Sequence, residues 1–439
     1  MLRLSWLLIA VVGVLVVFAV PSFADSQARI VRLGDVQGDV QIDRNTGQGF
    51  EKAFLNLPIT QGVKLRVGKD GRAVVELEDG STLRLTPDTV IDFPQLSLRD
   101  SGTKATAIHL QEGIAYINFV GTKDQDLTVG FAHEKLLLTQ SAHLRIGMAD
   151  TVATVAVFNG DVRVEGDAGS VSVGKNQTAS FDLGNGDQSK VVKDIEPEPF
   201  DAWDKQQDQY QKQYAKSGSY GSYSPYAYGT TDLNYYGSFI NAPGYGTLWQ
   251  PYFAGAGWDP FMNGAWAFYP GFGYTWVSGY PWGWIPYHYG SWTYLPAYGW
   301  AWQPGGAWTG WSQPRIIHPP SNFLLPKPPT GPGQGTIMVN RGGPPIQPGK
   351  SNRLGISNNS AGLGIPRGGV KNLDQLSHTV QQRGFAETKV HTAPVATNSW
   401  NSGYSAAHMG AMGGGRAPSA SPGRSVSSHG GVGHASVRR

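Results

Sequence analysis

Apolar and polar residues alternate along much of the first half of the chain. The alternation is clearest in Ala73–Leu77, Thr82–Leu85 and Val162–Val164. A period of two places alternate side chains on one face of a β-sheet. The turns between such runs carry pairs that tolerate the positive φ angles of two-residue hairpins: Asp70-Gly71, Asp79-Gly80, Asn159-Gly160 and Asn185-Gly186. The pattern predicts a mainly β fold whose first domain, residues 25–195, is an all-β sandwich, barrel or β-solenoid with a core of its own.

The order of these strands and turn glycines resembles the extracytoplasmic domain of the FecR family. The stretches that carry the resemblance are Gly62–Gly68, Ala73–Leu77, Asp79–Leu85, Leu110–Tyr116 and Val155–Val164. The resemblance implies an all-β envelope domain, which in the founding members relays iron-siderophore signals to a sigma factor. Those members have a cytoplasmic sigma-binding region before a membrane helix, whereas only three residues precede the first apolar run here. We therefore expect no sigma-factor binding and a domain reused for sensing or binding.

The N-terminus has the parts of a secretory signal peptide. Arg3 supplies a positive charge, residues 4–20 are apolar, and the small residues Ser22 and Ala24 follow. Cleavage after Ala24 makes residues 1–24 the signal peptide and predicts a periplasmic or secreted protein. The alternative is an uncleaved N-terminal membrane anchor, because a spanning helix needs only about 17–25 apolar residues.

Helical periodicity begins after the Glu-Pro-Glu-Pro sequence at residues 196–199. Over residues 196–216, one face of a predicted linker helix carries Phe200, Trp203, Gln207, Tyr210 and Tyr214. The opposite, polar face carries Asp201, Asp204, Lys205, Asp208 and Lys212. We interpret the helix as a connector that packs its aromatic stripe on a neighbouring domain. The alternative is a helix that binds a partner.

An internal repeat occupies residues 217–311, where 31 of 95 residues are aromatic. The pattern Gly-[Ser/Ala]-aromatic-x3-Pro-x-[Tyr/Phe]-Gly-x2-Trp starts at Gly237, Gly264 and Gly290. Each copy predicts a β-hairpin, and three hairpins must pack together to bury their apolar faces. Residues 281–292 are similar to an uncharacterised Trp/Tyr/Gly-rich domain that follows FecR-like domains in secreted bacterial proteins and has no assigned activity.

The rings of this repeat have two interpretations. Cross-strand aromatic pairs stabilise hairpins, whereas exposed uncharged rings suit stacking on sugars or on another apolar surface. Copies only 27 and 26 residues apart leave little chain with which to bury every ring. The densest cluster is the candidate ligand platform, which consists of Trp282, Trp284, Tyr287, His288, Tyr289 and Trp292.

From residue 312 onward the chain is rich in Gly, Pro, Ser and Asn and poor in apolar residues. This composition predicts a disordered tail over residues 312–439, with a short helix over Asn372–Gln382. The tail carries 13 Lys/Arg and two acidic residues, while residues 1–216 have a net charge of −6. Such a tail suits contact with anionic polymers, or it serves only to solubilise the protein or to span a surface. The dispersed cations lack interleaved aromatic residues, so we expect no specific nucleic-acid binding.

Motifs for catalysis or metal binding are absent from the sequence. It has no cysteine and no Gly-x-Ser-x-Gly, Walker or His-Glu-x-x-His motif. The first three histidines stand alone, and the acidic residues lie in turns or, like Glu76 and Glu78, on strand faces expected to meet solvent. We expect no catalytic residue, no metal and no cofactor.

These features lead to one functional hypothesis and two alternatives. The first is a non-enzymatic envelope protein with a sensing or scaffold domain and an aromatic platform for envelope polysaccharide or an envelope protein. The second is a structural or assembly protein whose aromatic hairpins associate with one another or with a partner. The third, ranked last, is an envelope hydrolase with an unrecognised carboxylate site.

We predict that the mature protein begins at Asp25. N-terminal sequencing of protein recovered from outside the cytoplasm tests the cleavage site. An Ala24→Arg variant is the matched control and should keep residues 1–24, because cleavage requires a small residue before the cut. A native protein that starts at Met1 or Leu2 would show an uncleaved anchor instead.

Overall fold

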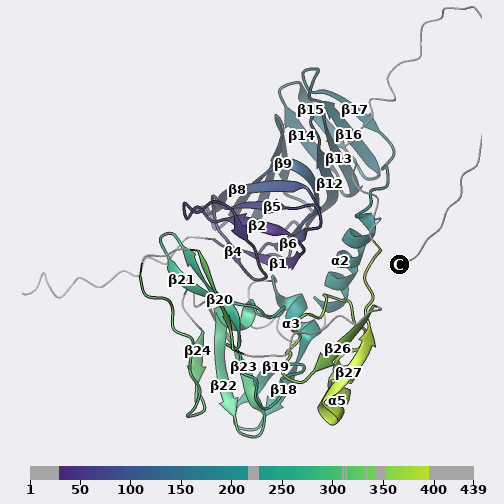
Figure 1. Cartoon of the computed structure of the whole chain (residues 1–439). Helices are drawn as coiled ribbons and strands as arrows, with labels where there is room; N and C mark the ends of the chain where they lie inside the picture. The colour runs from purple at the N-terminus through teal and green to yellow at the C-terminus, as the bar shows by residue number, and fades with distance from the viewer. Residues whose placement is uncertain are drawn as a thin grey trace, which may run out of the picture. The chain divides into compact units, whose positions relative to one another are not determined.

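A computed structural model describes residues 29–215, 227–308, 311, 314–331, 335–341 and 352–394 (Figure 1). It is mainly β, with 47% strand and 11% helix, which confirms the predicted fold class. The predicted signal peptide and the last part of the predicted tail, residues 395–439, lie outside the described residues. No helix of the described ranges is long and apolar enough to cross a membrane.

The first domain is built entirely from strands. They are β1 (Val31–Gln37), β2 (Val40–Asp43), β3 (Glu51–Lys52), β4 (Pro58–Ile59), β5 (Lys64–Val67), β6 (Arg72–Glu76), β7 (Thr82–Leu85), β8 (Thr89–Leu98), β9 (Lys104–Phe119), β10 (Gln125–Phe131), β11 (Glu134–Leu138), β12 (Ala142–Met148), β13 (Val152–Asn159), β14 (Val162–Gly166), β15 (Gly169–Val173), β16 (Gln177–Asp182) and β17 (Gln188–Val192). We call this part the β-domain.

The strands of the β-domain form two layers that share β9. One layer has the order β4-β1-β6-β7-β9-β12-β13-β16-β17. The other has the order β3-β2-β5-β8-β9-β10-β11-β14-β15. Alternate apolar residues of both layers, such as Leu65 and Val75, belong to one hydrophobic core. The alternation in the sequence therefore predicted an all-β domain correctly, and of the sandwich, barrel and β-solenoid that it left open, the two layers around one core correspond to the sandwich.

Strand β9 passes from one layer to the other at Gly113. Its first part pairs with β8 and β10, and its second part pairs with β7 and β12. Gly113 has φ +87°, and a Cβ atom there would lie 2.5 Å from the carbonyl oxygen of Asp88. Only glycine fits both the dihedral angle and the space.

The predicted repeat forms three hairpins, one for each copy. They are β18 (Gly237–Ala242) with β19 (Gly246–Pro251), β20 (Asn263–Tyr269) with β21 (Gly273–Ser278), and β22 (Tyr289–Leu295) with β23 (Gly299–Trp308). In every copy the first aromatic residue of the pattern lies directly opposite its tryptophan: Phe239 with Trp249, Trp266 with Trp276, and Trp292 with Trp302. The register is thus the same in all three copies, and each copy forms the hairpin that the sequence predicted.

The first glycine of each copy makes room for that tryptophan. A Cβ atom on Gly237 would lie 2.3 Å from Cζ2 of Trp249, and one on Gly264 would lie 2.4 Å from Cζ2 of Trp276. In the third copy, a Cβ atom on Gly290 would lie 3.0 Å from Nε1 of Trp302. The ring on the returning strand therefore covers the glycine on the outgoing one, which explains why the two residues recur together.

The linker helix α2 (Asp201–Tyr214) lies within the predicted range and packs on both neighbouring parts of the chain. Trp203 joins Val74 and Tyr116 of the β-domain in one small core, and Tyr210 joins the core of the aromatic hairpins. This confirms that the aromatic stripe packs on neighbouring domains. Two short helices, α3 (Thr230–Tyr236) and α4 (Ile285–His288), precede the first and third hairpins.

The prediction of disorder from residue 312 is wrong for the described residues as far as 394. They contain β24 (Arg315–Ile317), β25 (Thr336–Asn340), β26 (Arg353–Ser357), α5 (Leu373–Arg383) and β27 (Phe385–Lys389). The first and third hairpins share one sheet, which β24 extends by pairing with β22, and the second hairpin forms another sheet, which β25 extends by pairing with β20. β26 pairs with β27 beside α5 (Figure 1). Helix α5 coincides with the short helix predicted there. The composition was misleading because it shows only that the segment has too few apolar residues to form a core alone. In the structure, the segment contributes its apolar residues to the core of the aromatic hairpins.

Tyrosine and tryptophan side chains hold the backbone of this C-terminal segment. The Tyr235 hydroxyl donates to the carbonyl of Val370 at 2.9 Å, and the Tyr236 hydroxyl donates to that of Ile365 at 2.6 Å. The indole N–H of Trp282 donates to the carbonyl of Ala361 at 2.6 Å. Apolar residues of the segment then enter the aromatic core: Leu354, Ile356, Ile365, Val370, Leu373 and Val380.

We predict that Ile356→Ala lowers the free energy of unfolding by about 2–5 kcal/mol, because Ile356 is fully buried in the aromatic core. Denaturant unfolding of the two proteins measures the difference. Leu324→Ala is the matched control, since that leucine is 76% exposed and should change stability little. An Ile356→Ala protein as stable as the parent would mean that the segment after residue 352 does not belong to the folded core.

Candidate functional site

The six residues of the predicted ligand platform are buried. Trp282, Trp284, Tyr289 and Trp292 have no exposed surface, and Tyr287 and His288 are at most 4% exposed. Their rings pack on one another, with 4.3 Å between the ring centroids of Trp284 and His288 and 5.8 Å between those of Trp282 and Trp292. Stacking on a ligand needs an open ring face, and these six residues present none in this structure. The hairpins contain few aliphatic residues, so aromatic rings fill their core.

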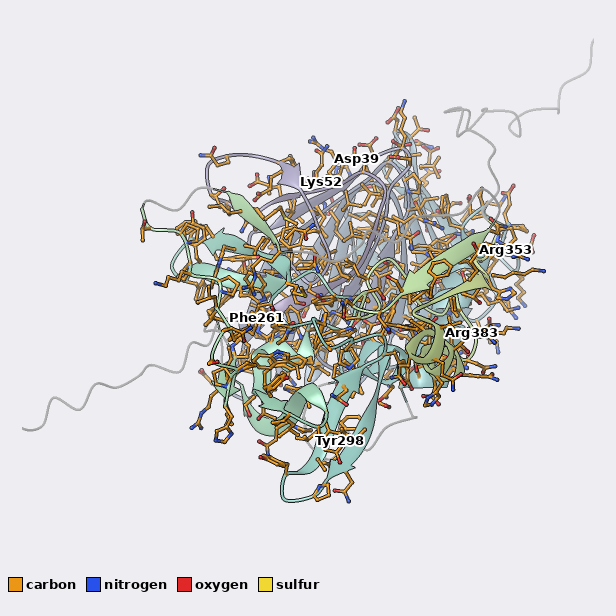
Figure 2. All side chains as sticks on the ribbon, turned by 60° about the horizontal axis from the view of Figure 1, so that its bottom comes forward. Asp39, Lys52, Phe261, Tyr298, Arg353 and Arg383 are labelled. Atoms are coloured by element: carbon orange, nitrogen blue, oxygen red, sulfur yellow. The ribbon has the colours of Figure 1, made fainter. Side chains whose placement is uncertain are left out.

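Among the residues of the repeat whose side chains the structure describes, the exposed rings are those at the hairpin tips. Tyr245, Phe272 and Tyr298 are the [Tyr/Phe] of the three copies and are 47%, 36% and 45% exposed. The glycine after each has a positive φ angle, between 76° and 81°, and open space around it. Figure 2 shows Tyr298 at the end of its hairpin. The Pro-x-[Tyr/Phe]-Gly turn in the sequence pattern indicated that these rings would be exposed, because turn residues lie at the surface.

Four charged side chains from distant parts of the chain meet in the interior. Arg32 lies on β1, Glu76 on β6, Asp232 on α3, and Arg367 between β26 and α5. All four are buried, and Arg32 and Asp232 have no exposed surface. Two carboxylates and two guanidinium groups give no net charge, and we call these four residues the buried charge cluster. Buried charges are tolerated only when they are paired, so the cluster requires all of these segments at once.

Each carboxylate of the cluster contacts both arginines. Asp232 accepts hydrogen bonds from Nη1 of Arg32 at 2.5 Å and from Nε of Arg367 at 2.8 Å. Glu76 accepts from Nη1 of Arg32 at 3.0 Å and from Nη2 of Arg367. The hydroxyl of Tyr210, on α2, donates to Asp232 at 2.7 Å. Every carboxylate oxygen of the cluster therefore accepts a hydrogen bond.

The pKa values follow from this geometry. Burial alone raises the pKa of Glu76, but the charges of Arg32 and Arg367 and the N–H of Gly229 outweigh burial and lower the pKa to about 2. Burial by itself lowers the pKa of Arg367, but the carboxylates of Asp232 and Glu76 outweigh it and hold the pKa well above its ordinary value. The Glu76 carboxylate and the Arg367 guanidinium group are thus both charged at neutral pH.

Arg32 also joins the β-domain to the segment that carries the predicted platform. Its Nη2 donates to the carbonyl of Pro281 at 2.7 Å, and its Nε donates to Oδ1 of Asn56 at 2.9 Å. The amide of Asn56 then donates to the carbonyls of Ser278 and Tyr280 at 3.0 and 2.7 Å. The β-domain therefore recognises the backbone just before the platform residues.

A second group of buried charges fixes α2 to the β-domain. Arg84, on β7, has no exposed surface and pairs with Asp204 and Asp208 of α2 at 2.5 and 2.6 Å. Nε2 of His143 lies 2.9 Å from Oδ2 of Asp204. Burial alone raises the pKa of Asp204, but the hydrogen bond with His143 and the charge of Arg84 outweigh it and lower the pKa.

Several acidic residues expected to meet solvent do not. Asp204 and Asp208 of the predicted polar helix face are buried, as are Glu76 and Glu78 on the β-domain. Glu78 pairs with Arg29 at 2.7 Å. Alternation correctly placed Glu76 and Glu78 on the face opposite the sandwich core, but it could not show that other parts of the chain cover that face. The arginines that pair with these acids gave a sequence signal for buried charge, because Arg32 and Arg84 each stand between apolar strand residues.

The buried charge cluster is saturated with partners, so it is suited to joining segments and not to binding a ligand. Within the described ranges, no group of three or more His, Asp or Glu side chains is placed to hold a metal ion. The two parts also share apolar contacts, since Ala267, Tyr269 and Val277 of the second hairpin belong to the β-domain core. The site formed here is a junction between the β-domain and the hairpins.

Comparison with known proteins gives two family matches. Residues 63–163 match the FecR protein family, and residues 230–317 match a family of unknown function, DUF6600. The chain thus carries a FecR domain followed by a DUF6600 domain, in agreement with both resemblances found in the sequence. The search of curated proteins finds no match.

Two solved structures also match, both described as a "putative anti-sigma factor" from Parabacteroides distasonis ATCC 8503. They share 19% and 18% sequence identity with this chain, with a TM-score of 0.28 in each case. Each match covers 32% of this chain and 63% of the other protein, so the chain spans less than two thirds of the length of these relatives.

We predict that Glu76→Gln lowers the free energy of unfolding at pH 7 by about 3–5 kcal/mol, because it leaves a buried positive charge unpaired. The Glu76 pKa is depressed from 4.5 to about 2, so its contribution is present above pH 4.5 and is lost as the pH falls toward 2. The difference between parent and variant should therefore shrink between pH 7 and pH 3, as measured by denaturant unfolding. Glu112→Gln, at an exposed position, is the control. A Glu76→Gln effect that does not change with pH would contradict the low pKa.

Proposed function

We propose that this protein, with its FecR domain followed by a DUF6600 domain, is a non-enzymatic scaffold or sensing protein of the bacterial cell envelope. The observation that carries the proposal is the buried charge cluster, to which the β-domain, α3 and the C-terminal segment all contribute. The FecR and DUF6600 domains are therefore proposed to act as one unit. A secreted or periplasmic location, reached through the predicted signal peptide, belongs to the same proposal.

Coupling of the domains suits a sensing or scaffold role. A contact made by the hairpins can change the β-domain only if the two respond together, and a shared core with buried ion pairs supports such coupling. Tyr269 illustrates the connection, because its ring packs in the β-domain core and its hydroxyl donates to the carbonyl of Pro58 at 2.6 Å. The saturated charge cluster, in contrast, leaves no group free for acid–base chemistry.

We place the contact with envelope material at the hairpin tips. Tyr245, Phe272 and Tyr298 present uncharged aromatic surface at three equivalent positions, and exposed apolar surface on a folded protein commonly marks an interaction site. The second hypothesis, assembly of the protein with itself or with a partner, uses the same exposed rings. The two hypotheses differ in what contacts the tips: envelope material in the first, and another copy of the chain or a partner in the second.

We predict that the full mature chain co-sediments with isolated bacterial envelope material. A variant with Tyr245→Ser, Phe272→Ser and Tyr298→Ser should lose most of this binding, because it removes the exposed rings while leaving the buried core intact. The matched control replaces exposed apolar residues outside the repeat, with Leu137→Ser, Val191→Ser and Phe385→Ser. Analytical ultracentrifugation of each protein alone reports self-association.

Two outcomes would overturn this placement. Absence of binding together with concentration-dependent self-association that the tip variant abolishes would favour assembly. Equal loss of binding in the tip variant and in the control would show that the tips are not the contact surface.

A further inference from the structure

One hairpin tip lines a cleft of the β-domain. A cavity of about 450 Å³ is bounded by Pro270 and Phe272 of the second tip and by β-domain residues that include Gln61, Leu96 and Leu98. Sites for small organic molecules range over about 300–1,000 Å³. Neither Tyr245 nor Tyr298 lines this cavity, so the three equivalent tips differ in what surrounds them.

The aromatic wall of the cleft is held in position from behind. Phe272 stacks on Trp311 with 4.4 Å between ring centroids and 29° between ring planes. Trp311 in turn packs on Tyr269 at 4.9 Å, and the guanidinium group of Arg44 lies 4.9 Å from the ring centroid of Tyr269. Phe272 still exposes 36% of its surface. A supported ring with an open face needs little ordering when it binds a ligand.

The charges of the cleft are neutralised within the protein. Arg29 donates to Oε1 and Oε2 of Glu78 at 2.8 and 2.7 Å. Arg44 donates from Nε to Oε1 of Glu51 at 2.8 Å and from Nη1 to the carbonyl of Phe268 at 2.5 Å. Each guanidinium group therefore already has a carboxylate partner, and the cleft offers no unpaired positive charge to an anionic ligand.

Neutral polar groups complete the wall. Gln61 is exposed, and its Oε1 accepts from the N–H of Leu96 at 3.3 Å, which orients the amide and leaves its NH2 group as a donor. Asn45 donates to the carbonyl of Gly62 at 3.4 Å, so its side-chain oxygen remains an acceptor. An aromatic face beside uncharged donors and acceptors matches a sugar ring, which has an apolar C–H face and hydroxyl groups at its edge.

We infer that this cleft binds a neutral saccharide, with one pyranose ring stacked on Phe272 and its hydroxyl groups hydrogen-bonded to Gln61 and Asn45. The inference deepens the proposed function and rests on it, because it names the chemical class of envelope material that the second tip recognises. The buried tryptophans of the hairpins support Phe272 only indirectly, by holding the repeat in register.

The test is isothermal titration calorimetry of the full mature chain with four hexasaccharides. Three are neutral: cellohexaose, maltohexaose and hexa-N-acetylchitohexaose. The fourth, hexagalacturonate, is anionic. We expect at least one neutral hexaose to bind more tightly than hexagalacturonate. Phe272→Ala should weaken that binding about tenfold, the scale of one lost aromatic contact. Gln61→Ala should weaken it as well.

Phe385→Ala is the matched control, because it removes an exposed phenylalanine ring that lies outside both the repeat and the cleft. Its affinity for the neutral hexaose should equal that of the parent protein. Binding of none of the neutral hexaoses, tighter binding of hexagalacturonate, or equal weakening by Phe272→Ala and Phe385→Ala would each overturn the inference. Co-sedimentation with envelope material, if retained in those cases, would show that the proposed function survives without this saccharide site.

Discussion

The structure depends on the pairing of two buried carboxylates, those of Glu76 and Asp232. Neither could remain charged in the interior without a partner, and the protein supplies Arg32 from its first strand and Arg367 from its C-terminal segment. Ion pairs of this kind add little net stability compared with apolar packing, but they tolerate only one arrangement, because any other leaves charges unpaired. The cluster therefore determines the arrangement of the β-domain, α3 and the C-terminal segment more than it adds to the stability of that arrangement.

Aromatic rings have the corresponding role in the interior of the hairpins. With few aliphatic side chains available, the repeat builds its core from tryptophan and tyrosine, and the polar atoms of some of these rings serve as hydrogen-bond donors. Tyr235, Tyr236 and Trp282 each hold a backbone carbonyl of the C-terminal segment. A single kind of side chain thus supplies both apolar packing and the polar contacts that keep a glycine- and proline-rich segment in place. The rings at the turns, Tyr245, Phe272 and Tyr298, stay exposed.

The parts of the fold that follow from local rules could be predicted. Alternation and turn pairs gave the β-domain, and the spacing of glycine and tryptophan gave three hairpins in one register, since both patterns reflect contacts between neighbouring strands. Helix α5 was also visible in a segment otherwise expected to be disordered. Prediction failed where a side chain's surroundings come from elsewhere in the chain. Asp204 and Asp208 look like solvent-facing helix residues until Arg84 is placed beside them. Trp284 looks like ligand-binding surface until the rings of Tyr228 and His288 pack on it.

By itself, the sequence determined that the β-domain consists of strands, where the hairpins turn, and that the repeat must bury aromatic faces, because periodicity and turn chemistry act over a few residues. The tertiary structure decided which rings are core and which are surface, which acids are buried, and that the segment over residues 352–394 is folded. Those outcomes depend on contacts between residues more than 100 positions apart, as for Arg32 with Asp232 and Glu76 with Arg367. No local pattern records such contacts, because burial is a property of the space around a residue and not of its neighbours along the chain.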